Sequence, residues 1–207
     1  MDKSLTMEVI TSDNISNYRS AVHPDVKKVH LAVNDLSILK HFPNIVYLRF
    51  DKIGLTSLEG IENCPNIELL FCFDNELNDI SHVKHLKNLK YLFVSCNKIR
   101  NLYLEHETLQ ELSCDSNEMT SICLVCPNLV KLDCCENKLK HLCLRGSPNV
   151  SNLECHSNEL TSLEGISECV NMNKLSCDYN QLVSLRGLEN FHMMEILHCE
   201  VNYLTSL

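Results

Sequence analysis

The sequence has no tryptophan, little glycine and proline, and fewer basic than acidic side chains. It holds 5 Gly and 5 Pro in 207 residues, and its 18 Lys and Arg stand against 27 Asp and Glu, which gives a formal net charge of −9. Nucleic acids and anionic membranes are bound through positive charge, so this balance disfavours both as main partners. No apolar run has the length of a membrane span, and the N-terminal residues lack the apolar core of a signal peptide. We therefore expect a cytoplasmic chain; a nuclear location is the alternative, and an extracellular one is less favoured.

Linkers and low-complexity segments are also absent, and a repeat occupies most of the chain. The pattern apolar-x-x-apolar-x-(Cys or apolar)-x-x-Asn-x-apolar-x-x-apolar occurs nine times and is clearest from Val150 to Leu163. Its Asn position is occupied in turn by Asn34, Ile53, Asn75, Asn97, Asn117, Asn137, Asn158, Asn180 and Asn202. Repeats 19 to 22 residues apart that each carry one short strand stack into a solenoid with a parallel sheet and a continuous apolar core. We predict this solenoid over residues 26–207.

Residues 1–25 do not follow the repeat and are expected to cap its first open edge. The cap should contain a short strand and a short helix that begins at Ser12 or Asp13, with Ile15, Tyr18 and Val22 on one face. The last repeat ends at Leu207 without a polar cap. An uncapped strand edge favours pairing, so we expect end-to-end self-association, a frayed last repeat or a truncated chain.

The repeated Asn has a structural role. A side-chain amide both donates and accepts hydrogen bonds, so it can satisfy backbone groups of adjacent turns that stacking would otherwise bury unpaired. Ile53 cannot do this, and we expect a looser or shorter turn there. Gly60, Gly165 and Gly187 recur at one position of the 22-residue repeats and suit a turn with positive φ. The shorter repeats around Ile122–Leu124 and Leu142–Leu144 are expected to be extended on the convex side.

The 13 cysteines follow the repeat instead of forming an evident disulfide framework. One inward strand position holds Cys72, Cys114, Cys134, Cys155, Cys177 and Cys199, and one turn position holds Cys64, Cys126 and Cys169. Cys123 and Cys143 match on the convex side, and Cys96 and Cys135 are expected to face outward near the strands. An odd number at repeat-determined positions favours reduced thiols in a reducing compartment.

This pattern resembles the leucine-rich repeat. The 22-residue copies, such as Leu160-Thr-Ser-Leu-Glu-Gly-Ile166, resemble the subclass found in phosphatase regulatory subunits and in bacterial internalins, and the Leu-x-Cys-x-x-Asn copies are similar to the cysteine-ladder form of some internalins. The resemblance covers about residues 26–207. It implies an α/β repeat solenoid, an arc of nine short repeats with a concave parallel β-sheet and a mostly irregular or extended convex side. It also implies ligand binding on the concave strand face.

Six side chains on the expected strand face form an aromatic cluster over three adjacent repeats. They are Tyr47, Leu69, Phe71, Phe73, Tyr91 and Phe93. Grouped exposed aromatics are typical of interface hot spots. The alternative is that the cap or a loop covers them, or that the strands face the other way.

The later repeats place carboxylates on the same expected face. Asp133 and Glu154 are expected in one column of side chains, and Asp115, Asp178 and Glu200 in the next column. We call these five residues the acidic row; Glu111 and Glu136 lie beside it. Like charges on neighbouring strands repel, and a basic segment of a protein partner would relieve the repulsion. The alternative is a solvated face that keeps the protein soluble.

Cys135, His156 and Asp178 also lie in one row, on paper a nucleophile, a base and an orienting acid. Asp115, Asp133 and Glu154 with Cys135 and His156 also suggest a metal site. An open strand face lacks a water-excluding pocket and placed oxyanion donors, and side chains on a ladder should point in parallel. We therefore expect no enzyme activity, no cofactor and no metal.

The favoured hypothesis is a protein-interaction module that binds a protein partner on its concave face, as an adaptor or regulatory subunit. The alternative is an exported, internalin-like host-interaction protein. Thirteen free thiols would fit the first, and paired cysteines the second.

Overall fold

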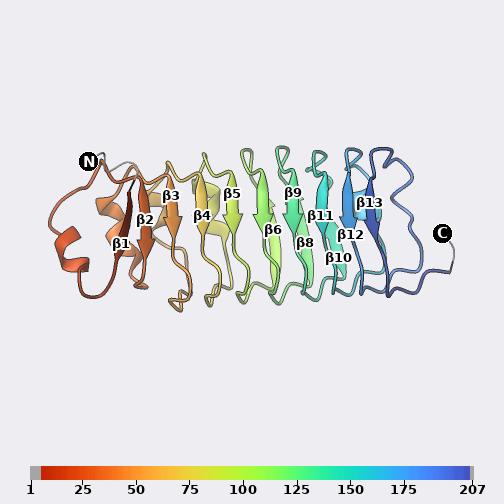
Figure 1. Ribbon diagram of the computed structural model, residues 1–207, viewed down its shortest axis with the longest axis horizontal. Helices are drawn as coiled ribbons and strands as arrows, with labels where there is room; N and C mark the ends of the chain where they lie inside the picture. Colours follow the sequence, from red (N-terminus) through yellow and green to blue (C-terminus); the bar gives the residue numbers. More distant parts are fainter. Residues whose placement is uncertain (1–5, 206–207) are drawn as a thin grey trace. The chain divides into compact units, whose positions relative to one another are not determined.

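A computed structural model describes residues 6–205 of the chain (Figure 1). The chain divides into two compact units: the N-terminal unit ends at Lys98 and the C-terminal unit begins at Ile99. Among the described residues, no helix has the length and apolar character needed to cross a membrane.

The N-terminal unit is a stack of parallel strands joined by loops with short 3-10 helices. Its strands, in sheet order, are β1 (Met7–Ile10), β2 (Lys28–Leu31), β3 (Tyr47–Arg49), β4 (Leu69–Phe71) and β5 (Tyr91–Phe93). The 3-10 helices are η1 (Ile15–Tyr18), η2 (Leu36–His41), η3 (Ile61–Asn63) and η4 (Ser81–His85). Successive strands pair one repeat apart, Leu48 with Leu70 and Leu70 with Leu92. Each of these leucines is fully buried, as the alternation of the repeat requires.

The segment that we expected to cap the stack, residues 1–25, contains a strand and a short 3-10 helix, and the helix begins later than predicted. Strand β1 extends the sheet by pairing with β2, and η1 follows it; residues 1–5 lie outside the described part. The residue before η1 is Asn14, not Ser12 or Asp13, and its amide holds the preceding turn by accepting from the Thr11 N–H and donating to the Val9 carbonyl.

The face expected on the cap helix forms only in part. Tyr18 packs against the rings of His23 and Phe42, at centroid distances of 5.3 and 5.5 Å. Val22 is exposed, because η1 ends at Tyr18 and the chain beyond it is not helical.

The C-terminal unit carries a parallel sheet on each side of its core (Figure 1). The strand-face sheet runs β7 (Glu111–Ser113), β9 (Lys131–Asp133), β11 (Asn152–Glu154), β12 (Lys174–Ser176) and β13 (Ile196–His198). The second sheet runs β10 (His141–Cys143), β8 (Ser121–Val125) and β6 (Asn101–Glu105). The extended convex segments predicted around Ile122–Leu124 and Leu142–Leu144 are therefore confirmed. Helix η5 (Glu164–Ile166) occupies the same side in a longer repeat.

The repeated glycine serves two different needs. Gly60 and Gly187 have φ of 101° and 103°, the left-handed conformation predicted for them. Gly165 does not. There a Cβ would lie 1.9 Å from the Leu142 carbonyl oxygen, so glycine is required by the close approach of two backbones.

Eight of the nine repeats, from the second onward, turn inward through a left-handed residue just before the Asn position. These residues are Lys52, Asp74, Cys96, Ser116, Glu136, Ser157, Tyr179 and Val201, with φ between 51° and 56°. None is glycine, so each turn holds an L-residue in a conformation it disfavours. The asparagine that follows stabilises this turn.

Asn158 shows the bonding that the repeat predicts. Its Oδ1 accepts from the Leu139 N–H of the preceding repeat at 2.9 Å. Its Nδ2 donates to carbonyls of Cys134 in the preceding repeat and of Cys155 and His156 in its own, at 3.0 to 3.2 Å. The predicted role of the asparagine, satisfying backbone groups of adjacent turns, is confirmed. The same acceptor bond to the preceding repeat is made by Asn75, Asn97, Asn117, Asn137, Asn180 and Asn202.

The first two repeats depart from this ladder. Asn34 is exposed. The turn at Ile53 keeps the left-handed residue that precedes the Asn position in the later repeats, and it is held by the next repeat, so the expected looser turn is wrong. Lys52 before it has φ of 56°, and Asn75 of the next repeat accepts from the N–H groups of Ile53 and Leu55. Gly54 follows with φ of 66°, which adds a second left-handed residue to this turn.

The cysteines divide largely as predicted. The inward and turn positions are fully buried, except Cys199, which is half-buried in the last described repeat. Cys96 is exposed, but Cys135 is only 4% exposed and so does not face solvent as expected. Burial raises the pKa of Cys126 to about 11 and that of Cys64, Cys169 and Cys177 to about 12. All 13 thiols are free in this structure.

Replacing Asn158 with alanine should destabilise the protein by about 2–4 kcal/mol, because the Leu139 N–H and three carbonyls lose their partner inside the stack. Urea unfolding measures this loss. Asn171→Ala, an exposed asparagine in the same unit, is the matched control and should change stability by less than about 0.5 kcal/mol. Equal effects at the two positions would contradict the structural role of the ladder.

The buried thiols should also make the protein sensitive to alkali. A thiol whose pKa is raised in the fold binds its proton more tightly there than in the unfolded chain, so stability is complete below the ordinary pKa of 9.0 and falls as pH rises toward 12. Each such thiol contributes a slope of up to about 1.4 kcal/mol per pH unit within this window. Unfolding curves from pH 8 to 11 measure it. Cys177→Ala should show a shallower decline than the wild type, whereas Cys96→Ala should not.

Candidate functional sites on the strand face

The aromatic cluster predicted in the N-terminal unit is present and continuous. Phe71 and Phe93 on β4 and β5 are stacked, with centroids 4.6 Å apart and planes within 7°. Tyr47 on β3 lies 5.5 Å from the Phe71 ring, and Phe73 meets Phe71 edge-on at 6.4 Å. Strand pairing in register explains the stacking, because Phe71 and Phe93 are direct partners across β4 and β5.

These side chains reach solvent. Tyr91 is 37% exposed, and the other members of the cluster are half-buried. Neither the cap nor a loop buries them among the described residues, so the strands face as expected. We call Tyr47, Leu69, Phe71, Phe73, Tyr91 and Phe93 the aromatic patch.

A charged pair borders the aromatic patch. Arg49 at the end of β3 places its guanidinium 5.4 Å from the Phe73 centroid and forms an ion pair with Asp51. This hydrogen-bonded carboxylate, with its charge, raises the pKa of Arg49, against the opposing effect of burial. Arg49 was not predicted as part of the patch, although it is the direct register partner of Phe71 across β3 and β4.

The acidic row lies on the strand face of the C-terminal unit, but lysines of that face pair with part of it. Lys174 Nζ lies 2.8 Å from Glu154 Oε1, and Lys131 Nζ lies 2.7 Å from Glu111 Oε1. The repulsion expected among stacked carboxylates is therefore partly relieved within the chain. The spacing of 20 residues between each Lys and Glu was the signal that sequence analysis overlooked.

Two carboxylates of the row have opposite electrostatic surroundings. Burial, with the nearby charges of Asp115 and Glu154, raises the pKa of Asp133. Burial also acts to raise the pKa of Asp178, but hydrogen bonds, among them those from the Glu200 N–H and the Ser176 hydroxyl, hold it below its ordinary value.

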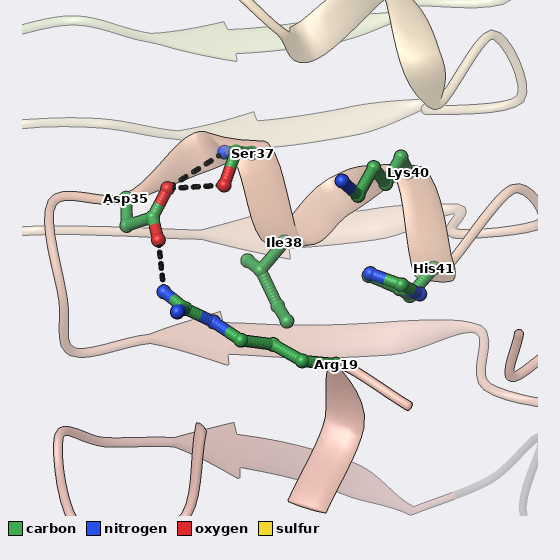
Figure 2. A pocket seen from close by; sticks show the side chains of 6 residues that line it. All are labelled: Arg19, Asp35, Ser37, Ile38, Lys40 and His41. Carbon is green, nitrogen blue, oxygen red and sulfur yellow. Dashed lines mark hydrogen bonds and ion pairs between the residues drawn. The ribbon is translucent and has the colours of Figure 1, made fainter. Parts of the chain in front are cut away.

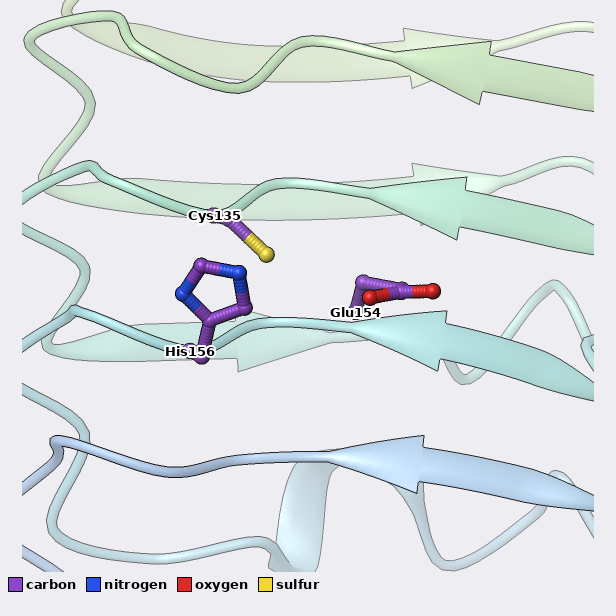
Figure 3. Close-up of side chains that lie close together, drawn as sticks. All are labelled: Cys135, Glu154 and His156. Atoms are coloured by element: carbon purple, nitrogen blue, oxygen red, sulfur yellow. The ribbon is translucent and has the colours of Figure 1, made fainter. Parts of the chain in front are cut away.

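One group on this face converges although parallel side chains were expected. Cys135, Glu154 and His156 each offer one ligand atom, and these atoms lie within 4.8 Å of one another. Figure 3 shows a ring nitrogen of His156 facing the Cys135 sulfur, with Glu154 beside them. Asp178 belongs to a different group, with His198 and Glu200, so the imagined row of Cys135, His156 and Asp178 is not one site.

The N-terminal unit also contains a small polar pocket near the cap (Figure 2). It has a volume of about 280 Å³ and is lined by Arg19, Asp35, Ser37, Ile38, Lys40 and His41. Arg19 Nη2 lies 2.5 Å from Asp35 Oδ2, and the other Asp35 oxygen accepts from the N–H and hydroxyl of Ser37. Asp35 is thus committed to the arginine and to capping η2.

No protein-family model matches this sequence, and no curated protein matches it. Solved structures do. The leucine-rich repeat domain of APL1B is 16% identical with a TM-score of 0.74, and the match covers 94% of this chain and 62% of that one. The functional domain of InlJ from Listeria monocytogenes, which includes a cysteine ladder, is 22% identical with a TM-score of 0.70, covering 99% and 51%.

The ectodomain of the plant membrane receptor kinase GASSHO1/SCHENGEN3 from Arabidopsis thaliana, in complex with CASPARIAN STRIP INTEGRITY FACTOR 2, is 16% identical with a TM-score of 0.68, covering 86% and 24%. This chain therefore spans less than two thirds of each of these three structures. Identities this low establish the fold alone. The repeats, the parallel strands and these likenesses show that the chain has the leucine-rich-repeat fold.

Proposed function

We propose that the chain is a protein-interaction module, an adaptor or regulatory subunit that binds a protein partner on its strand face. The observation that carries this proposal is the aromatic patch. Its rings pack against one another, with Phe71 stacked on Phe93. Preordered aromatic side chains lose little entropy on binding and supply large apolar area, which is why they recur as hot spots.

The partner is proposed to carry a basic segment for the C-terminal unit. Lys131 and Lys174 form ion pairs with Glu111 and Glu154. The same face of the unit also carries the carboxylates of Asp115, Asp133, Asp178 and Glu200. Such a row attracts positive charge and orients it more than it adds affinity. The complex of GASSHO1/SCHENGEN3 with CASPARIAN STRIP INTEGRITY FACTOR 2 supports a polypeptide ligand for this fold.

An exported host-interaction protein is the second candidate, favoured by the likeness to the cysteine-ladder domain of InlJ. The observation in this chain that supports it is the buried column of Cys114, Cys134, Cys155 and Cys177. The two candidates differ in the compartment they require, and hence in the oxidation state of accessible cysteines.

Substituting the aromatic patch should abolish capture of the partner. Phe71→Glu/Phe93→Glu places two charges at its centre, and affinity capture from source-cell lysate should lose by at least tenfold a protein that the wild type retains. Tyr103→Glu, an exposed tyrosine on β6 in the other unit, is the control and should retain it. A partner kept equally by all three proteins would contradict the patch.

A second variant in the same experiment tests the contribution of the acidic row apart from that of the aromatic patch. Asp115→Asn/Asp178→Asn should weaken capture and reduce its dependence on salt, because the lost charges interact over the Debye length. Each variant must match the wild type in circular dichroism. Light scattering must show the wild type to be monomeric, because end-to-end pairing through the exposed Ile196 and Leu197 of β13 is the competing form of association.

A thiol count on protein purified from its source without reductant should give 13 free thiols after unfolding, if the chain works in a reducing compartment. Cys123 and Cys143 are the pair best placed to form a disulfide, because they are direct partners on β8 and β10 and both are half-buried. A count of eleven, with these two joined, would favour the exported candidate.

A further inference from the structure

We propose that Cys135, Glu154 and His156 form a binding site for a single zinc ion. The site shares Glu154 with the acidic row but does not depend on the aromatic patch, since it rests on donor geometry and not on exposed apolar area. Thiol, imidazole and carboxylate are the three ligand types that zinc prefers in proteins, and three protein ligands leave a fourth position for water. A thiol among the ligands disfavours magnesium and calcium, which take oxygen donors.

The fold positions the three donors from two adjacent strands. Cys135 and His156 are the second residues after β9 and β11, each just before a left-handed turn residue, Glu136 or Ser157. A backbone bond from the Glu136 N–H to the His156 carbonyl, 3.1 Å long, fixes the two chain segments relative to each other. Glu154 ends β11 and points to the same face as His156, because residues two apart on a strand share a side.

The spacing of the donors is close to what a zinc ion needs. Their ligand atoms lie within 4.8 Å of one another, and tetrahedral ligands at zinc are about 3.5 Å apart, so small side-chain rotations close the site. His156 Nδ1 lies 3.2 Å from the Ser157 hydroxyl, which leaves Nε2 for the metal and fixes the ring. Cys135 is 4% exposed, so its sulfur is held and largely shielded from bulk water.

The carboxylates around the site favour a cation. Two of them, Asp133 and Glu154, already have partners within the protein. Asp133 accepts hydrogen bonds from the Cys135 N–H, at 3.2 Å, and from the Cys135 thiol. Lys174 holds Glu154 Oε1 at 2.8 Å, which leaves the second carboxylate oxygen for a ligand bond. Zinc would displace the thiol proton: Zn²⁺ binds the sulfur as thiolate, one proton leaves to solvent, and the imidazole and carboxylate bind unchanged.

A second group, Asp178, His198 and Glu200, also has its ligand atoms within 4.8 Å of one another but is less suited to bind zinc. Both Asp178 oxygens already accept hydrogen bonds, from the Ser176 hydroxyl and the Glu200 N–H. His198 and Glu200 are exposed, and the group has no thiol. It therefore provides matched control positions on the next strands.

The test is titration of the fully reduced chain with zinc alone, by calorimetry in two buffers of different ionisation enthalpy. One equivalent should bind with release of a proton. Cobalt as a spectroscopic probe should give thiolate-to-metal charge-transfer absorption. Cys135→Ser and His156→Gln should each weaken zinc binding at least tenfold, whereas Cys96→Ser and His198→Gln should leave it unchanged. Lys174→Met should tighten binding severalfold by releasing Glu154.

Several results would overturn the site. They are the absence of stoichiometric binding by the wild type, undiminished binding by both Cys135→Ser and His156→Gln, an equal loss in Cys96→Ser, or weaker binding by Lys174→Met. Thermal unfolding in the absence of metal must first match the wild type for each variant. If Cys135→Ser fails to fold, His156→Gln still tests the site, because His156 is only half-buried and its replacement does not disturb the core.

Discussion

The structure depends on one recurrent arrangement, an asparagine amide that bonds the turn of its own repeat to the repeat before it. Each turn enters through a left-handed residue that is not glycine, which costs roughly 1 kcal/mol without compensation. Buried backbone groups in these turns need partners, and one side chain supplies four, as at Asn158. Because every bond set links two repeats, the turn is favourable only inside a stack, so that neighbouring repeats stabilise one another.

The cysteine column follows from the same stacking. The position beside the strand is crowded, and cysteine fills it as a small apolar side chain that still offers a weak donor. The Cys134 sulfur lies 3.5 Å from the Glu154 carbonyl and the Cys177 sulfur 3.3 Å from the His198 carbonyl, in each case on the next strand. A thiol here adds a contact across repeats that a methyl group would not, and its burial keeps it protonated and unreactive.

How far the sequence predicts this structure depends on whether a feature repeats. The strands, the asparagine bonds and the convex strands at Ile122–Leu124 follow from spacing alone. So does the aromatic patch, since strand register makes Phe71 and Phe93 neighbours. Features that occur once were missed: the turn at Ile53 keeps its form through Gly54 and Asn75, and Gly165 is needed for clearance, not for its φ. The burial of Cys135 was also missed, because it depends on side chains from the neighbouring repeat.

Stacking in register gives each side-chain column a fixed neighbour distance, and the chemistry of the column decides whether that distance is favourable. For Phe71 and Phe93 it is near the ideal separation of two stacked rings. For carboxylates the same distance is repulsive. In the C-terminal unit this repulsion is reduced where a lysine lies beside a glutamate, as Lys174 does beside Glu154. Cys135 and His156 also lie among the carboxylates of this unit. A bound cation relieves the same repulsion more completely than a lysine, because it contacts several donors at once. The acidic row and the proposed zinc site are thus two consequences of one constraint, and the aromatic patch is its apolar counterpart.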